Sequence, residues 1–240
     1  MTPPTTLVLL PGMDGSGTLF ADFVRMLDPQ VRPIVVSYPK VQPLDYNGLV
    51  DFVLPHLPTD QRFVLLGESF SGPVAISIAA RRPTLLAGLI LSCSFARYPT
   101  AMLRPLKFLT PLMPMQRELA GLVATFMFGQ FSSAAMKDAL YRALDGVTGE
   151  TLRTRLHAVL DVDTTGRLRD IGVPVLYLQA AHDRVVAAAA EKCIARHLPA
   201  MKTVRLTGPH LLLQTRPAET AQVIAEFIRS LGSTEGIAPQ

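Results

Sequence analysis

Short apolar runs alternate along this chain with longer segments in which apolar residues recur at helical spacing. The runs are almost free of polar residues and cover positions 7–10, 34–37, 63–66, 89–91, 173–178 and 203–206. Uninterrupted apolar runs of this length are expected of parallel strands that helices cover on both faces. The runs are therefore predicted to be buried strands of a mostly parallel sheet.

The segments between these runs have the length and the apolar periodicity of helices. This pattern predicts helices over residues 20–27, 46–57, 70–81, 187–197 and 217–231. Strands and helices that alternate in this way indicate a doubly wound α/β fold, with a mostly parallel sheet of about six strands.

The stretch 97–165 interrupts the alternation, since it contains no convincing strand and is far longer than an ordinary connection of about two to six residues. It is rich in leucine, methionine and phenylalanine, and Pro105, Pro111 and Pro114 divide it into short helices. We predict an α/β core formed by residues 1–96 and 166–240, with residues 97–165 inserted in it as a helical cap.

Composition narrows the classes of protein that remain. The 240 residues are 49% hydrophobic and 18% charged, as in a globular chain with a large core. The net charge of +4 is scattered without a basic run, which argues against nucleic-acid binding. Cys93 and Cys193 lie far apart in apolar surroundings, which predicts buried free thiols. No apolar stretch reaches about 18 residues and residues 1–6 carry no basic leader, so we expect a cytoplasmic protein without a stable membrane span.

Ser69 lies in the segment Gly-Glu-Ser-Phe-Ser-Gly of residues 67–72, between a predicted strand and a predicted helix. Serine is a weak nucleophile unless a base removes its proton and a rigid backbone presents its oxygen. The small residues Gly67, Ser71 and Gly72 allow the close approach of strand and helix that such a turn needs. The segment indicates a nucleophile elbow, with a tight turn that has no chemical role as the alternative.

This segment resembles the elbow of the α/β-hydrolase superfamily, which is usually Gly-x-Ser-x-Gly. Ser71 replaces the second glycine and Gly72 follows it. The resemblance covers nearly the whole chain and begins at the family's third strand, so the first two antiparallel strands of that fold are expected to be absent. It implies that Ser69 is the nucleophile of a serine hydrolase.

In that family an acid and then a histidine follow the nucleophile along the chain. Asp183 comes after the predicted strand 173–178, and His210 comes after the predicted strand 203–206. Because the carboxyl ends of parallel strands share one edge of the sheet, both loops are expected to lie beside Ser69. Asp183 as a helix cap and His210 as a structural histidine are the alternatives.

The resemblance also implies two backbone donors for an oxyanion, namely the N–H groups of Phe70 and Met13. Met13 lies in the loop Pro-Gly-Met-Asp-Gly-Ser-Gly of residues 11–17, where Pro11 replaces the family's usual histidine. The loop lacks the lysine of a nucleotide-binding P-loop. Asp14, in the same loop, has two possible roles, fixing the loop or meeting the substrate.

These residues together imply cleavage of a carboxylic ester or thioester through an acyl-Ser69 intermediate, with no cofactor and no metal. The methionines and phenylalanines of residues 97–165 suit a small-molecule acyl substrate of apolar character, although packing of the cap onto the core explains them too. An acyltransferase with the same three residues, and a non-enzymatic sensor of small molecules, remain as alternatives.

Overall fold

The structure is a computed structural model, and it describes residues 5–98 and 117–233. Residues 99–116, which are part of the predicted cap, lie outside the described residues. The strands of the described chain are β1 (Thr5–Leu10), β2 (Val31–Val35), β3 (Phe63–Glu68), β4 (Leu86–Ser92), β5 (Val175–Ala180) and β6 (Lys202–Leu206).

The strands form one open sheet in the order β2-β1-β3-β4-β5-β6, and every neighbouring pair is parallel. The predicted doubly wound fold without two leading antiparallel strands is thereby confirmed for the described residues. The chain moves from β1 outward to β2, and then returns to β3 on the other side of β1. Such a reversal leaves a crevice at the carboxyl ends of β1 and β3, where ligands bind in open α/β sheets.

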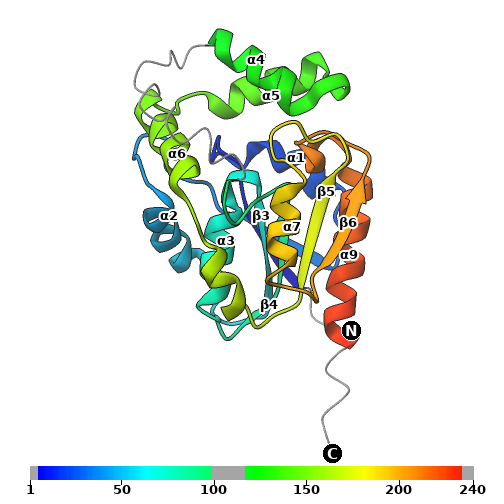
Figure 1. The fold of residues 1–240 in the computed structure, drawn as a ribbon. Helices are drawn as coiled ribbons and strands as arrows, with labels where there is room; N and C mark the ends of the chain where they lie inside the picture. Colours follow the sequence, from blue (N-terminus) through cyan, green and yellow to red (C-terminus); the bar gives the residue numbers. More distant parts are fainter. Residues whose placement is uncertain (1–4, 99–116, 234–240) are drawn as a thin grey trace, which may run out of the picture.

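Helices cover both faces of this sheet and also the edge formed by the carboxyl ends of its strands (Figure 1). The α-helices in the described residues are α1 (Ala21–Arg25), α2 (Tyr46–Val53), α3 (Gly72–Ala80), α4 (Arg117–Phe128), α5 (Ala134–Leu144), α6 (Gly149–Asp161), α7 (Ala189–Ala195), α8 (Leu212–Thr215) and α9 (Pro217–Ser233). Single 3-10 turns are η1 (Thr18–Phe20), η2 (Leu54–His56), η3 (Ser69–Ser71) and η5 (Gly129–Phe131), and η6 (Thr165–Asp170) is longer.

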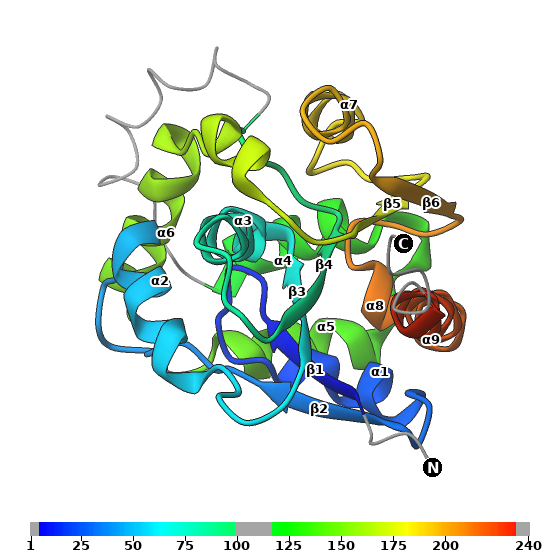
Figure 2. The ribbon, with the colours of Figure 1, turned by 90° about the horizontal axis from the view of Figure 1, so that it is seen from below.

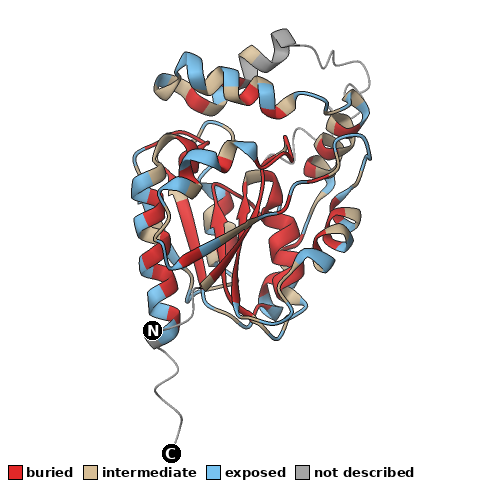
Figure 3. Cartoon of the chain, turned by 180° about the vertical axis from the view of Figure 1, so that it is seen from behind, coloured by how far each residue is buried: buried red, intermediate tan, exposed pale blue. Residues whose placement is uncertain are grey.

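The two faces have separate apolar cores because successive side chains of a strand point in opposite directions. In β1, Val8 and Leu10 pack toward α2, α3 and α7, whereas Leu7 and Leu9 pack toward α1, α8 and α9. Figure 2 shows these two groups of helices on opposite sides of the sheet, and Figure 3 shows the buried strands between them. Burial on both faces explains why β1, β3, β4 and β5 appear as apolar runs in the sequence. Strand β6 lies at an edge of the sheet and is largely exposed, so the prediction that the run at 203–206 is a buried strand is wrong.

Strand β2 differs from the prediction, since it covers Val31–Val35 instead of residues 34–37. It pairs only with β1, so its outer edge has no neighbouring strand in the described chain. An edge strand tolerates Pro33, whose nitrogen cannot donate to a ladder, and its exposed positions weaken the apolar signal. The apolar residues Ile34, Val35 and Val36, on which the prediction was based, therefore lie at the end of the strand and just after it.

Helices α4 and α5 lie across the carboxyl edge of the sheet (Figure 1). A small apolar cluster joins them to the core through Ala124, Phe128, Leu140 and Leu211, and the N–H of Leu211 donates to the carbonyl of Met127 at 3.5 Å. Helix α6 begins at the N-cap Thr148, whose side chain accepts from the Thr151 N–H. Within the described ranges no helix is both long and apolar enough to cross a bilayer.

Leu65 in the central strand β3 provides a test of the core. Its side chain is fully buried, so Leu65→Ala should lower the free energy of unfolding by about 2–5 kcal/mol through lost contacts and an unfilled cavity. Urea denaturation followed by circular dichroism measures the change. Val41, which is 72% exposed, gives the matched control: Val41→Ala should change the same quantity by less than about 0.5 kcal/mol.

Candidate active site

Ser69 lies on a sharp turn between β3 and α3, at the start of η3. Its φ of 49° falls in the left-handed region, which side chains other than glycine rarely occupy. The turn brings α3 so close to β3 that a Cβ on Gly67 would lie 2.7 Å from the Ser71 carbonyl oxygen and 2.8 Å from the Ala75 Cβ. The close approach inferred from the small residues around Ser69 is therefore present in the structure.

The side chain of Ser71 makes two hydrogen bonds that a glycine at this position could not make. Its hydroxyl donates to the carbonyl oxygen of Pro11, in the loop after β1. A serine hydroxyl has a single proton, so the Tyr38 hydroxyl, 2.6 Å away, is the donor in the second hydrogen bond of this group. The departure from the usual glycine thus ties the turn at Ser69 to the loop that contains Met13.

Ser94, after β4, supports the same turn from the other side. Its Oγ donates to the carbonyl oxygen of Ser69 at 2.5 Å. Gly72 leaves the space for this contact, because a Cβ on Gly72 would collide with the Ser94 side chain. The strained backbone at Ser69 is therefore held by its neighbours on both sides.

The three residues that the sequence singled out lie side by side at the carboxyl edge of the sheet. Ser69 Oγ is 2.7 Å from His210 Nε2, and His210 Nδ1 is 2.9 Å from Asp183 Oδ2 and 3.0 Å from Oδ1. The Val185 and Val186 N–H groups both donate to Asp183 Oδ1 at 2.8 Å, so the carboxylate orientation is fixed. The Asp183 and His210 side chains are 8% and 1% exposed.

The hydrogen bonds define the protonation of the imidazole. Both carboxylate oxygens of Asp183 are acceptors, so His210 Nδ1 carries the proton and donates it. Nε2 is then free to accept from the hydroxyl of Ser69. An imidazole held in this tautomer is able to remove the serine proton. A purely structural histidine would not need to present Nε2 to the hydroxyl of Ser69.

The loop after β1 turns tightly at Met13 and Asp14. The N–H of Gly15 donates to the carbonyl of Gly12 at 3.0 Å. Asp14 Oδ2 accepts from the N–H of Ser16 at 2.9 Å and from its Oγ at 2.6 Å. Asp14 is buried and supports its own loop, which favours the first of the two roles considered for it.

The carbonyl groups of the two expected oxyanion residues are both held by side chains from outside the turn. The Met13 carbonyl accepts from Arg155 Nη1 at 2.8 Å. The Phe70 carbonyl accepts from the Tyr46 hydroxyl at 3.0 Å, and the two rings stack with centroids 4.9 Å apart. Arg155 and Tyr46 were not identified from the sequence, because helical spacing indicates the face on which a residue lies but not the backbone groups that it contacts.

A buried carboxyl, Glu68, directly precedes Ser69. It is 2% exposed, and Gln214 Nε2 donates to its Oε1 at 3.0 Å and to its Oε2 at 3.3 Å. Burial raises the pKa of Glu68 to about 8; the Gln214 hydrogen bond opposes this and the charge of Asp14 adds to it. Glu68 and Gln214 join the turn at Ser69 to helix α8, which directly follows the His210 loop.

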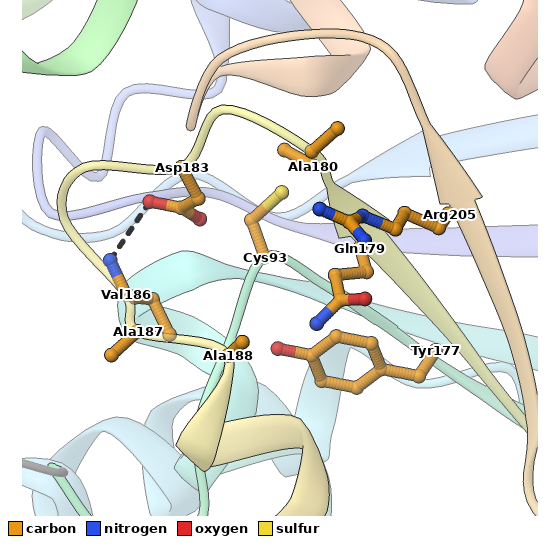
Figure 4. A pocket seen from close by; sticks show the side chains of 10 residues that line it. Cys93, Tyr177, Gln179, Ala180, Asp183, Val186, Ala187, Ala188 and Arg205 are labelled. Carbon is orange, nitrogen blue, oxygen red and sulfur yellow. Dashed lines mark hydrogen bonds between the residues drawn. The ribbon is translucent and has the colours of Figure 1, made fainter.

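A cavity of about 70 Å³ lies beside Asp183 and is lined also by Cys93, Tyr177, Gln179 and Arg205 (Figure 4). Neither Ser69 nor His210 lines it, and it is much smaller than the roughly 300–1,000 Å³ of ordinary ligand sites. This cavity is therefore not the site of an acyl substrate. Burial, and then the charge of Asp183, raise the pKa of the Cys93 thiol, which lines the cavity, well above its usual value.

The cysteine prediction is correct for one residue and wrong for the other. Cys93 is buried and free, whereas the free Cys193 on α7 is partly exposed. A short helix on the surface of the sheet exposes one side, which an apolar composition does not reveal. Among the described residues no cluster of histidine, cysteine, aspartate or glutamate is suited to a metal ion.

A parallel sheet with a strained serine turn at its carboxyl edge is the arrangement of the α/β-hydrolase fold. A family model described as the alpha/beta hydrolase family matches residues 7–223. The chain belongs to the alpha/beta hydrolase family.

Two proteins of known name are similar to the chain. Polyketide synthase ThaQ of Burkholderia thailandensis is 29% identical over 225 residues, which are 84% of this chain and 11% of that protein. Phytyl ester synthase 1 of Arabidopsis thaliana is 31% identical over 115 residues, which are 44% of this chain and 16% of that protein. The chain thus corresponds to a small part of each of these relatives.

The enol-lactonase of Burkholderia xenovorans is one of the solved structures with the same fold. It has a TM-score of 0.81 and 19% sequence identity, and the match covers 94% of this chain and 91% of that one. At this identity the likeness concerns the fold.

The raised pKa of Glu68 predicts how stability depends on pH. The Glu68 carboxyl releases its proton near pH 4.5 in the unfolded chain but only near pH 8 in the folded chain. The free energy of unfolding should therefore fall as the pH rises through this window. Glu68→Gln keeps a neutral side chain at all pH values. The free energy of unfolding of the variant, relative to that of the parent chain, should rise by up to about 1.4 kcal/mol for each pH unit in the window.

Urea denaturation at about pH 5.5 and about pH 8.5 measures this difference. Glu226→Gln, on the exposed side of α9, shows what the loss of a surface carboxylate does in the same assay. Equal pH dependence in the parent chain and in Glu68→Gln would mean that Glu68 is ionised in the folded protein.

Proposed function

We propose that the chain is a serine hydrolase that cleaves a carboxylic ester or thioester through an acyl-Ser69 intermediate. The observation that carries the proposal is the hydrogen-bonded series from Ser69 Oγ through the His210 imidazole to Asp183. The series stands on three separate loops at the carboxyl edge of the sheet. This geometry matches the roles of nucleophile, general base and orienting acid.

In the proposed reaction His210 Nε2 takes the proton of Ser69 as Oγ attacks the carbonyl carbon of the substrate. Asp183 holds the imidazole tautomer and stabilises the imidazolium that forms. The tetrahedral intermediate collapses when His210 gives the proton to the leaving alcohol or thiol, and the acyl group stays on Ser69. Water, deprotonated by the same histidine, then releases the acid and restores the serine.

The N–H groups of Met13 and Phe70 are proposed to stabilise the negative oxygen of both tetrahedral intermediates. Donors of this kind act most strongly when they are fixed before the charge develops, because then no reorganisation accompanies the reaction. The hydrogen bonds to the carbonyls of Met13 and Phe70 support this role, since they restrict the backbone at both positions.

Residues 97–165 are proposed to be a cap, and the substrate a small molecule with an apolar acyl group. Of this segment the structure describes 97–98 and 117–165. Helix α4 contacts the loop of His210 through Met127 and Leu211, and Met136 on α5 packs against the same cluster. Methionine side chains adapt to irregular apolar groups, which suits an acyl chain at this place.

The first test is covalent labelling and loss of turnover. A fluorophosphonate probe should label the chain at Ser69, as located by peptide mass spectrometry. Ser69→Ala should lower kcat for a p-nitrophenyl ester by about 10⁴- to 10⁶-fold, and His210→Ala should have a similar effect, because the residues act as a unit. His56→Ala changes an exposed histidine at η2 and should leave kcat unchanged.

Thioesters and oxygen esters of the same acyl groups, in a series of increasing chain length, distinguish the two substrate classes. Unchanged turnover in Ser69→Ala would overturn the proposal. A chain that is not labelled, yet gains thermal stability from a small acyl ligand, would instead be a sensor on a hydrolase scaffold.

Acyl transfer is a second candidate, because part of the chain is similar to phytyl ester synthase 1. A transferase uses the same acyl-serine and replaces water with an alcohol in the second step. The Ser69, His210 and Asp183 geometry serves both reactions, so the acceptor must be determined by experiment.

Product analysis in the presence of added long-chain alcohols decides between the candidates. A hydrolase should give mainly free acid, because water is in large excess over any added alcohol. A transferase should give mainly the new ester, since it binds the alcohol beside the acyl-serine. Ser69→Ala is the control for uncatalysed exchange in both cases.

A further inference from the structure

Arg155 is a fully buried arginine that the hydrogen bonds among Ser69, His210 and Asp183 do not involve. It lies on α6, is 1% exposed, and is one of the largest fully buried side chains of the described residues. Arginine keeps its charge at neutral pH, and a buried charge is costly unless it is well partnered. The partners of Arg155 therefore indicate why this charge is buried.

The guanidinium of Arg155 donates to backbone carbonyl groups in two separate segments. Nη1 donates to Met13 O at 2.8 Å and to Asp14 O at 2.9 Å, in the loop after β1. Nη2 donates to Pro39 O at 2.9 Å, in the segment after β2. One side chain of α6 thus joins the loop after β1 to the segment after β2.

The surroundings of the guanidinium are shaped to receive it. Gly15 has a φ of 71°, and a Cβ there would lie 2.5 Å from Arg155 Nη1, so both backbone and space require glycine. The guanidinium carbon lies 5.7 Å from the centroid of the Tyr38 ring, within reach of a cation–π attraction. Tyr38 donates in turn to Ser71, two residues after Ser69.

Stability by itself does not account for this arrangement. Within the described chain Arg155 Nε is buried without a hydrogen-bond partner, and such a group destabilises the fold by about 1–3 kcal/mol. An apolar side chain of similar volume would avoid that loss and often stabilises a core equally well. What an apolar side chain lacks is the ability to fix the orientation of three peptide groups.

We propose that Arg155 is a positioning residue, which sets the place of the Met13 N–H by clamping the two peptide groups that follow it. The inference rests on the proposed function, because it concerns the oxyanion donors of that reaction. Arg155 contacts the carbonyl oxygens of Met13 and Asp14, so it acts on the direction of the Met13 N–H through the backbone. The position of helix α6 consequently determines the geometry of the loop after β1, residues 11–17, and with it the direction of the Met13 N–H.

The test compares Arg155→Lys and Arg155→Met with the parent chain. Lysine keeps the charge and the length of the stem, but its single ammonium cannot span the carbonyls of Met13, Asp14 and Pro39 in the same geometry. Both variants should lower kcat for a p-nitrophenyl ester by about 10- to 100-fold, with KM changed less than about threefold, because a misplaced donor affects the transition state more than the bound substrate.

An inhibitor pair separates this role from general structural damage. The serine hydroxyl adds to the carbonyl of a trifluoromethyl ketone, and the adduct carries an oxyanion. The affinity of the variants for this ketone should therefore fall in proportion to kcat/KM. The matched methyl ketone remains mostly unreacted and should bind the variants as it binds the parent chain. Arg153→Met, two residues earlier on the same helix, is the matched control and should leave kcat and both affinities unchanged.

Urea denaturation establishes that each variant is folded, and Arg155→Lys provides the result if Arg155→Met does not fold. A folded Arg155→Lys with kcat and trifluoromethyl ketone affinity within about twofold of the parent chain would overturn the proposal. Equal loss of affinity for both ketones would also overturn it, since that pattern means a damaged pocket. If the parent chain itself is neither labelled at Ser69 nor active on esters, the proposed function fails first, and it removes this inference with it.

Discussion

The close approach of strand β3 and helix α3 around Ser69 is the constraint on which the rest of the site depends. Ser69 occupies a left-handed backbone conformation that is unfavourable for a serine, so the surrounding structure must hold it there. Gly67 removes the side chain that would separate strand from helix, and Ser94 binds the carbonyl of Ser69. With the backbone held in this conformation, Oγ of Ser69 lies 2.7 Å from Nε2 of His210.

A second set of contacts connects the turn at Ser69 to the loop after β1. Ser71 binds the carbonyl of Pro11, and Tyr38 lies between Ser71 and the guanidinium of Arg155. These are buried polar groups in an apolar interior, where hydrogen bonds are strong and an unpaired group is costly. The loop after β1 is therefore held by hydrogen bonds that fix direction, as a site that stabilises developing charge requires.

In the proposed reaction, the same geometry serves water or an alcohol as the group that releases the acyl chain. The residues proposed to form and stabilise the acyl-serine would not select this second reactant, because His210 would activate either one in the same position. Selection must come from the surfaces around this position, and α4 and α5 contribute apolar groups beside the His210 loop. The chemical step and the choice of acceptor are thus assigned to different parts of the chain.

The sequence by itself determined the fold class, since uninterrupted apolar runs at regular spacing arise from strands that are buried on both faces. It also brought Ser69, Asp183 and His210 together, because residues that follow parallel strands must meet at one edge of the sheet. It did not determine the bounds of the edge strand β2, whose partial exposure weakens the apolar pattern. Nor did it identify Arg155 or Glu68, because helical or strand periodicity gives the face of a residue but not its partners. Only the tertiary structure decided that these ionisable residues are buried. Their hydrogen bonds to Met13, Asp14, Pro39 and Gln214 join segments far apart in the chain, and such contacts exist only once the chain has folded.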